Sequence, residues 1–171
     1  LLSRRQRQMC IRDRAYTPMK RILFLVDRNN LGKQAEGEFG RFRLTENGDP
    51  FNTIFTVNRI RSSKVPQDSN VVISTIQRLF SLLKGEDIED TDNDEEYDDT
   101  KEIEFQTNPN LPPEFFDMII IDECHRSIYG NWKKVLNYFN TAKLVGLTAT
   151  PVPETKAFFN SNTIVNLSLI H

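Results

Sequence analysis

The stretch that decides the fold is "FFDMIIIDECHRSIYG", residues 115–130. Its first seven residues are almost all apolar, and two carboxylates, Asp122 and Glu123, follow them directly. A short apolar run bounded by polar residues is typical of a strand that is buried on both faces. The pattern therefore predicts a buried strand at 115–121 that carries the two acids at its carboxyl end, with Cys124 and His125 behind them.

Working outward, similar patterns predict four more strands. Three are apolar runs, at 21–27, 71–74 and 142–150. The fourth, at 54–58, alternates apolar with polar residues. Apolar residues at helical spacing, or prolines suited to a helix start, predict helices between and after them: 28–42, 77–83, 131–140 and 151–160. Asn29 or Asn30 could cap the first helix, and Gly85 is a stop signal for the second.

Strands that alternate with helices predict an α/β fold with a parallel sheet covered by helices on both faces. In open sheets of this kind, ligands bind beyond the carboxyl ends of the strands. Polar residues stand at the carboxyl ends of four of the predicted strands: Asp27-Arg28, Ser74-Thr75, Asp122-Glu123 and Thr148-Ala149-Thr150. We expect these four groups to meet at one edge of the sheet and to form the functional site.

Composition narrows the class of protein. The chain has 171 residues, enough for one domain, and no apolar run reaches the roughly 18 residues of a membrane span. Two cysteines make no disulfide framework, so a reducing cytoplasm is the expected location. Residues 85–104 contain twelve acids and one lysine, so the rest of the chain has a net charge of +9. A basic body is compatible with a nucleic-acid partner.

The acidic stretch and the two ends are set apart from the fold. We expect 85–113 to be an exposed, disordered insertion, because so few apolar residues cannot offset the entropy of ordering. Residues 1–14 and 168–171 resemble peptides that arise when sequencing-adaptor DNA is translated, and the alternative for 1–14 is a disordered basic tail. The folded domain is therefore expected within 15–167.

The residues around Asp122 allow several kinds of site. Zinc usually requires four Cys or His ligands in paired spacings, and too few are available beside Cys124 and His125. Adjacent carboxylates at a strand end suit a magnesium–nucleotide site, where one acid holds Mg²⁺ through water and the other activates the attacking water. Adjacent residues of a strand point to opposite sides, so the two roles separate only if the chain turns there. The alternative is that the acids cap a following helix.

Four ordered motifs resemble those of superfamily 2 helicases and translocases, which are RecA-like motors. "IIIDECH" and "LVGLTATP" resemble motifs II and III, and "FLVDRNNLGKQ" and "VVISTIQRL" occupy the places of motifs Ia and Ib. The runs "DRNNLGKQA" and "DECHRSIYG" resemble more closely the motor domain of the restriction (R) subunit of type I restriction-modification enzymes. That resemblance implies ATP-driven translocation of duplex DNA before cleavage by a separate nuclease domain, in a complex with methyltransferase and specificity subunits.

The resemblance also implies residue roles. Asp122 would hold Mg²⁺ through water, Glu123 would be the catalytic base of ATP hydrolysis, and His125 would link the ATP site to motif III. Thr148, Ala149 and Thr150 would couple the nucleotide state to nucleic acid. Candidate contacts with the DNA backbone are Arg28, Gln34, Ser74, Thr75, Gln77 and Arg78. Ser74 and Thr75 could instead cap a helix, and Gln34 could be a solvated helix residue.

The sequence departs from the resemblance in one important respect. No phosphate-binding loop of the G-x-x-x-x-G-K-[ST] type occurs in it, and Gly32-Lys33 lacks the remaining residues of that loop. We therefore expect an incomplete first motor domain that does not hydrolyse ATP by itself. Two alternatives stay open: another DEAD/DEAH-like DNA or RNA helicase, and a non-catalytic α/β remnant or binding module.

Overall fold

Five parallel strands form one sheet in the computed structural model, which describes residues 19–44, 48–86, 105 and 108–160. The strands are β1 (Ile22–Val26), β2 (Val57–Arg59), β3 (Val71–Thr75), β4 (Met118–Ile121) and β5 (Lys143–Gly146). Their order across the sheet is β2-β3-β1-β4-β5, so β1 is central, and every neighbouring pair is parallel. The predicted parallel α/β sheet is confirmed.

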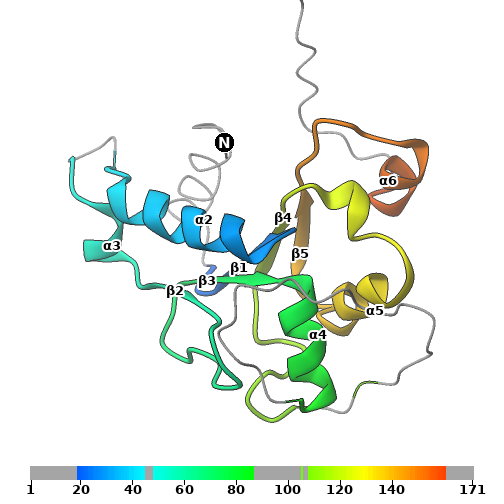
Figure 1. The fold of residues 1–171 in the computed structure, drawn as a ribbon, viewed down its shortest axis with the longest axis horizontal. Coiled ribbons are helices and arrows are strands. Elements are labelled where there is room, and N and C mark those ends of the chain that lie inside the picture. Colours follow the sequence, from blue (N-terminus) through cyan, green and yellow to red (C-terminus); the bar gives the residue numbers. More distant parts are fainter. Residues whose placement is uncertain (1–18, 45–47, 87–104, 106–107, 161–171) are drawn as a thin grey trace, which may run out of the picture.

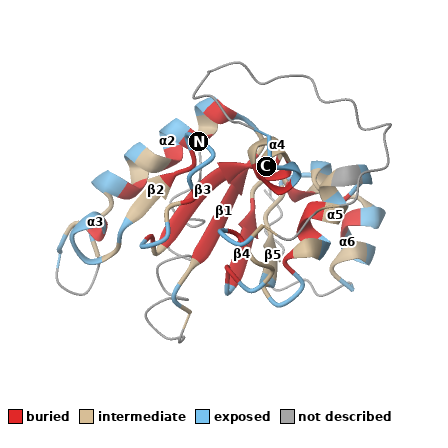
Figure 2. Ribbon diagram, turned by 90° about the horizontal axis from the view of Figure 1, so that it is seen from below, coloured by how far each residue is buried: buried red, intermediate tan, exposed pale blue. Residues whose placement is uncertain are grey.

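Helices cover both faces of this sheet (Figures 1 and 2). They are α2 (Asn29–Arg41), α3 (Phe51–Ile54), α4 (Ile76–Lys84), α5 (Gly130–Tyr138) and α6 (Pro153–Phe158), with a 3₁₀ turn, η1 (Cys124–Arg126), after β4. Among the residues that the structure describes, no helix combines the length and apolar character needed to cross a membrane.

The core lies in two layers because successive strand residues point to opposite faces. One layer joins Ile22, Phe24 and Val26 of β1 to Ala35 and Phe39 of α2. The other layer joins the alternate β1 residues, Leu23 and Leu25, to side chains from α4, from α5 and from the residue after α5: Leu79, Phe80, Val135, Leu136 and Phe139. β1, β3 and β4 are buried along their whole lengths, which is why the sequence shows them as continuous apolar runs (Figure 2).

The ends of α4 follow the predicted signals. Thr75 caps its start, since the Thr75 hydroxyl oxygen accepts a hydrogen bond from the Arg78 N–H at 3.3 Å. Gly85 ends it in the left-handed conformation at φ 77°, which glycine adopts without steric cost.

The predicted strand at 54–58 is wrong in its first half. Residues 51–54 form α3, and the strand begins at Val57. Phe51 is fully buried and its ring lies 5.5 Å from that of Phe39 and 4.8 Å from that of Phe55. Burying this aromatic cluster outweighs the weak preference of an alternating pattern for strand.

Two smaller expectations also need correction. Neither Asn29 nor Asn30 caps α2: the capping position is Arg28, and Asn29 is instead buried with its side-chain oxygen 2.6 Å from Arg59 Nη1. The segment from Asn108 to Pro113 belongs to the packed domain, because Leu111 is fully buried and its carbonyl accepts a hydrogen bond from the Tyr138 hydroxyl at 2.9 Å. The acidic residues 87–104 lie outside the described residues, as do 1–14 and 168–171.

Candidate functional site at the carboxyl edge of the sheet

The four polar groups predicted to converge do so. Parallel pairing places Val26 of β1 beside Thr75 of β3, Leu25 beside Ile121 of β4, and Ile121 beside Gly146 of β5. The residues that follow each of these strands therefore leave the sheet at the same edge. The Asp122 N–H extends the ladder by donating to the Leu25 carbonyl at 2.9 Å.

The chain turns sharply between the two acids. β4 ends at Ile121, and Glu123 takes the left-handed conformation at φ 49° and ψ 46° before η1 begins. A non-glycine residue in this region carries backbone strain, and such residues gather at functional sites. The chain thus turns at the point where distinct roles for the Asp122 and Glu123 carboxylates would require it to turn. The Glu123 side chain makes no capping hydrogen bond to η1.

The turn is fastened to the segment that follows β5. The Leu147 N–H donates to the Ile121 carbonyl at 2.8 Å, and the Cys124 N–H donates to the Leu147 carbonyl at 3.0 Å. The same Leu147 leads directly into Thr148-Ala149-Thr150. Backbone hydrogen bonds thus hold the residues that resemble motif II and motif III in a fixed relation.

His125 bridges the same two segments with its side chain. Its Nδ1 lies 3.0 Å from the Thr148 hydroxyl and 3.5 Å from the Thr150 hydroxyl. The Glu123 carboxylate lies 3.4 Å from the same ring nitrogen. His125 therefore touches both hydroxyls of the predicted coupling segment and one predicted catalytic acid, whereas Ala149 is exposed.

The electrostatics of the edge favour a bound cation. The pKa of Asp122 is raised, first because the carboxyl group is partly buried, and next because the negative charges of Glu123 and Asp27 lie close to it. Its carboxylate accepts a hydrogen bond from the Glu123 N–H at 3.1 Å, which only partly offsets these effects. Oxygen ligands in a negative environment are those that Mg²⁺ binds, so Asp122 fits the role of its ligand.

Behind the turn, packing is tight. Gly146 has no room for a side chain, because a Cβ atom there would lie 2.7 Å from the Cys124 sulfur and 2.6 Å from the Phe159 ring. Cys124 is buried and its thiol pKa is raised to about 11, chiefly by loss of solvation. Cys124 is therefore a packing residue under the turn.

Sequence reasoning named Asp27 and its neighbour without giving Asp27 a role. In the structure, its carboxylate accepts a hydrogen bond from Nη1 of Arg126 and lies 3.6 Å from Nε of Arg28. A signal in the sequence could have identified this pair: Asp27 follows β1 and Arg126 lies beyond β4, so opposite charges stand at two strand ends that were predicted to meet.

The candidate DNA contacts differ in accessibility. Arg28 and Gln34 are exposed, whereas Gln77 and Arg78 are half-buried, and Nη1 of Arg78 donates to the Ile60 carbonyl at 2.9 Å. Ser74 and Thr75 are buried, and Thr75 has the capping contact that its alternative role requires. Arg28 and Gln34, at the start and on the open side of α2, are the candidates that a phosphate could reach without rearrangement.

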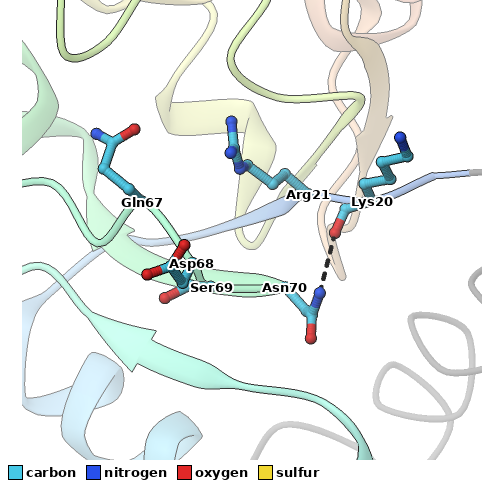
Figure 3. Close-up of a pocket in the computed structure, with 6 residues that line it drawn as sticks. All are labelled: Lys20, Arg21, Gln67, Asp68, Ser69 and Asn70. Carbon is cyan, nitrogen blue, oxygen red and sulfur yellow. Dashed lines mark hydrogen bonds between the residues drawn. The ribbon is translucent and has the colours of Figure 1, made fainter.

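A hollow lies at the opposite edge of the sheet. It has a volume of about 210 Å³ and lies before the starts of β1 and β3, where Lys20, Arg21, Gln67, Asp68, Ser69 and Asn70 line it (Figure 3). The Asn70 amide donates to the Lys20 carbonyl at 3.5 Å across it. This hollow is separate from the carboxylate edge and contains none of the predicted site residues.

Comparison with known proteins assigns a family. The family model described as "Type III restriction enzyme, res subunit" matches residues 9–153. The endonuclease subunit of the type I restriction enzyme EcoKI from Escherichia coli strain K12 is 31% identical over 160 residues, which cover 82% of this chain and 12% of that protein. The corresponding EcoAI subunit from Escherichia coli is 32% identical over 137 residues, 77% of this chain and 13% of that protein. The chain thus spans about an eighth of the length of these curated relatives.

Solved structures show the same fold. The Hef helicase domain of Pyrococcus furiosus superposes with a TM-score of 0.57 at 21% identity, covering 91% of this chain and 29% of that one. A hypothetical ATP-dependent RNA helicase from Sulfolobus tokodaii gives a TM-score of 0.56 at 16% identity, covering 94% and 42%. At these identities the likeness concerns the fold alone: the chain has the RecA-like fold that these two structures share.

Proposed function

The chain belongs to the restriction-enzyme res-subunit family, and on that premise we propose that it is part of an ATP-dependent DNA translocase, the motor of a type I restriction endonuclease subunit. The helicase-like domain of the family implies nucleotide binding. We propose ATP with Mg²⁺ as the ligands and duplex DNA as the track. Methyltransferase and specificity subunits are the proposed partners.

Each group at the carboxyl edge has a proposed task. Mg²⁺, held by Asp122 through water, would neutralise charge on the phosphate oxygens. Glu123, at the left-handed turn after Asp122, would accept a proton from the attacking water. His125 would pass the state of this site to Thr148 and Thr150, whose hydroxyls it contacts.

One observation carries the proposal: His125 lies within hydrogen-bonding distance of both Glu123 and Thr148. A purely structural α/β remnant has no need of a strained residue, two acids and a histidine that bridges two strand ends. Folding alone would favour replacing Asp122, because a partly buried carboxylate beside the charge of Glu123 costs stability. The arrangement is therefore better explained by nucleotide chemistry than by packing.

The test uses the complete protein that carries this sequence. We expect Glu123→Gln to lower DNA-stimulated ATP hydrolysis by a factor of at least about 100, while ATP binding, measured with a fluorescent analogue, stays within about twofold. Glu114→Gln removes the same charge from an exposed position before β4 and serves as the matched control. Normal DNA translocation by the Glu123→Gln protein would refute the role of Glu123.

The 171-residue chain itself gives a second test. Because its sequence has no phosphate-binding loop, we expect no ATP turnover from the purified chain, with or without duplex DNA. Turnover that duplex DNA stimulates and that Glu123→Gln abolishes would show that the chain is a self-sufficient ATPase. The absence of DNA-stimulated hydrolysis in the complete protein would instead favour a non-catalytic remnant.

A further inference from the structure

Asp27 is the point at which the two sides of the site meet. It follows β1, and only 20% of its side chain is exposed. Arg126, the last residue of η1, donates to the Asp27 carboxylate across 99 positions of sequence. Arg28, the residue before α2, has its Nε 3.6 Å from the same carboxylate oxygen. One acid thus contacts an arginine from the turn that carries Glu123 and the arginine just before α2, which is a candidate DNA contact.

These ion pairs do little for stability. The side chains of Arg126 and Arg28 are 53% and 62% exposed, and pairs between such exposed groups contribute little to stability. Their effect is on position. A guanidinium group has five N–H donors in a rigid fork, so an arginine that uses one or two of them on Asp27 still presents donors to a phosphate.

The surroundings of Asp27 make it sensitive to the state of the ATP site. Its charge acts on Asp122, the proposed Mg²⁺ ligand, and the bond from Arg126 offsets part of the negative charge that Asp27, Asp122 and Glu123 share. A cation bound at Asp122 would compete with Arg126 for electrostatic attraction to the same carboxylates. The attraction between Asp27 and Arg126 would then depend on the bound ligand. The attraction that Asp27 exerts on Arg28 would change with it.

We propose that Asp27 is a positioning residue that couples the ATP site to the DNA-facing helix, through Arg126 on one side and Arg28 on the other. This rests on the proposed function, since it assigns the coupling path of the same motor. His125 and Thr148 link the turn to the segment after β5, whereas Asp27 links the turn to α2, in the opposite direction along the sheet edge. Coupling of this kind is reciprocal, so DNA binding at Arg28 would act back on the turn.

The experiment measures the DNA concentration that gives half-maximal stimulation of ATP hydrolysis by the complete protein. We expect Asp27→Asn and Arg126→Gln each to raise it about fivefold or more, in the usual range of coupling between sites. The double variant should need no more DNA for half-maximal stimulation than the single variant that needs the most, because both changes break the same link. Asp27→Glu, which keeps the acid, should return the value to within about twofold of the unaltered protein, a rescue that damage to folding would not show.

Asp68→Asn is the matched control, since it removes an exposed acid from the opposite edge of the sheet (Figure 3). If Asp27→Asn behaves like Asp68→Asn while Glu123→Gln abolishes turnover, the coupling role of Asp27 is refuted and the proposed function stands. If effects of the two single variants simply add, the two residues act separately and the link is likewise refuted. Absence of DNA-stimulated hydrolysis in the unaltered protein would overturn the motor and the coupling together.

Discussion

Replacing Gly146 by alanine tests the tightest contact under the site. The added Cβ would lie 2.6 Å and 2.7 Å from two atoms of the Phe159 ring and 2.7 Å from the Cys124 sulfur. Favourable carbon contacts lie at about 3.5–4.0 Å, so the methyl group overlaps its neighbours by roughly 1 Å. Neither neighbour is a flexible chain end: one is an aromatic ring and the other a buried thiol. The turn at Glu123 or the chain after α6 must therefore move.

Overpacking of this size costs about 1–3 kcal/mol. At about 2 kcal/mol, the melting temperature of a chain of this length should fall by roughly 4–8 °C, as measured by calorimetry or dye binding. Gly37→Ala is the matched control. It makes the same change in the exposed middle of α2, where the added Cβ would meet no atom within 4 Å apart from its chain neighbours and the helix backbone, and should raise stability by about 0.5–1 kcal/mol through helix propensity.

A melting temperature for Gly146→Ala at or above that of Gly37→Ala would refute the reasoning. A double-variant cycle identifies which neighbouring side chain clashes with the added methyl group. Phe159→Leu should cost less in the Gly146→Ala background than in the unaltered chain, because a smaller side chain makes room for the methyl group. If the two costs are equal, Phe159 is not what fills the space at Gly146.

Two further predictions concern the turn. Glu123→Gly should be more stable to urea than Glu123→Gln by about 0.5–1 kcal/mol, because glycine takes the left-handed backbone without strain and glutamine does not; equal stability would show that the turn is unstrained. The Cys124 thiol, tested in a Cys10→Ser background, should react with a disulfide reagent at pH 8 at least about 100 times more slowly in the folded than in the urea-unfolded chain. Its pKa rises from 9.0 to about 11 on folding, which leaves roughly 100 times less thiolate below pH 9, so similar rates would contradict its burial.

The layout of the sheet could be predicted from sequence because parallel strands are buried on both faces. Continuous apolar runs marked β1, β3 and β4 directly, and the end of β4 was placed at the correct residue, Ile121. The start of β4 was placed three residues early, because Phe115 and Phe116 are apolar and buried without being part of the strand. Burial is what the sequence pattern measures, and strand pairing is only correlated with it.

The same limit explains the failure at 51–59. Its alternating residues suit a half-buried strand, yet Phe51 is held in α3 by rings from α2, which the local pattern does not contain. β2 pairs with β3 over three residues, too few for periodicity to reveal. Tertiary contacts decide the structure where the local signal is short.

At the site, sequence predicted which residues meet and not how they meet. Order along the chain and parallel topology are enough to bring Asp27, Asp122 and Thr148 to one edge. The left-handed backbone of Glu123 could not be foreseen, since glutamate has no preference for that region. The role of the strain becomes clear once Leu147 is considered: its two backbone hydrogen bonds, to Ile121 and Cys124, close over the turn and hold it there.

This arrangement would let the site transmit a change, as the proposed function requires. Four short connections leave one sheet edge, and β1 and β4 are rigid because they are paired on both sides and buried. Any rearrangement on ligand binding must therefore fall on the connections, where His125 contacts the segment after β5 and Arg126 contacts the residue after β1. One strained turn thus touches both neighbouring connections, so movement of that turn would reach both at once, and each contact can be broken by a single substitution without disturbing the sheet.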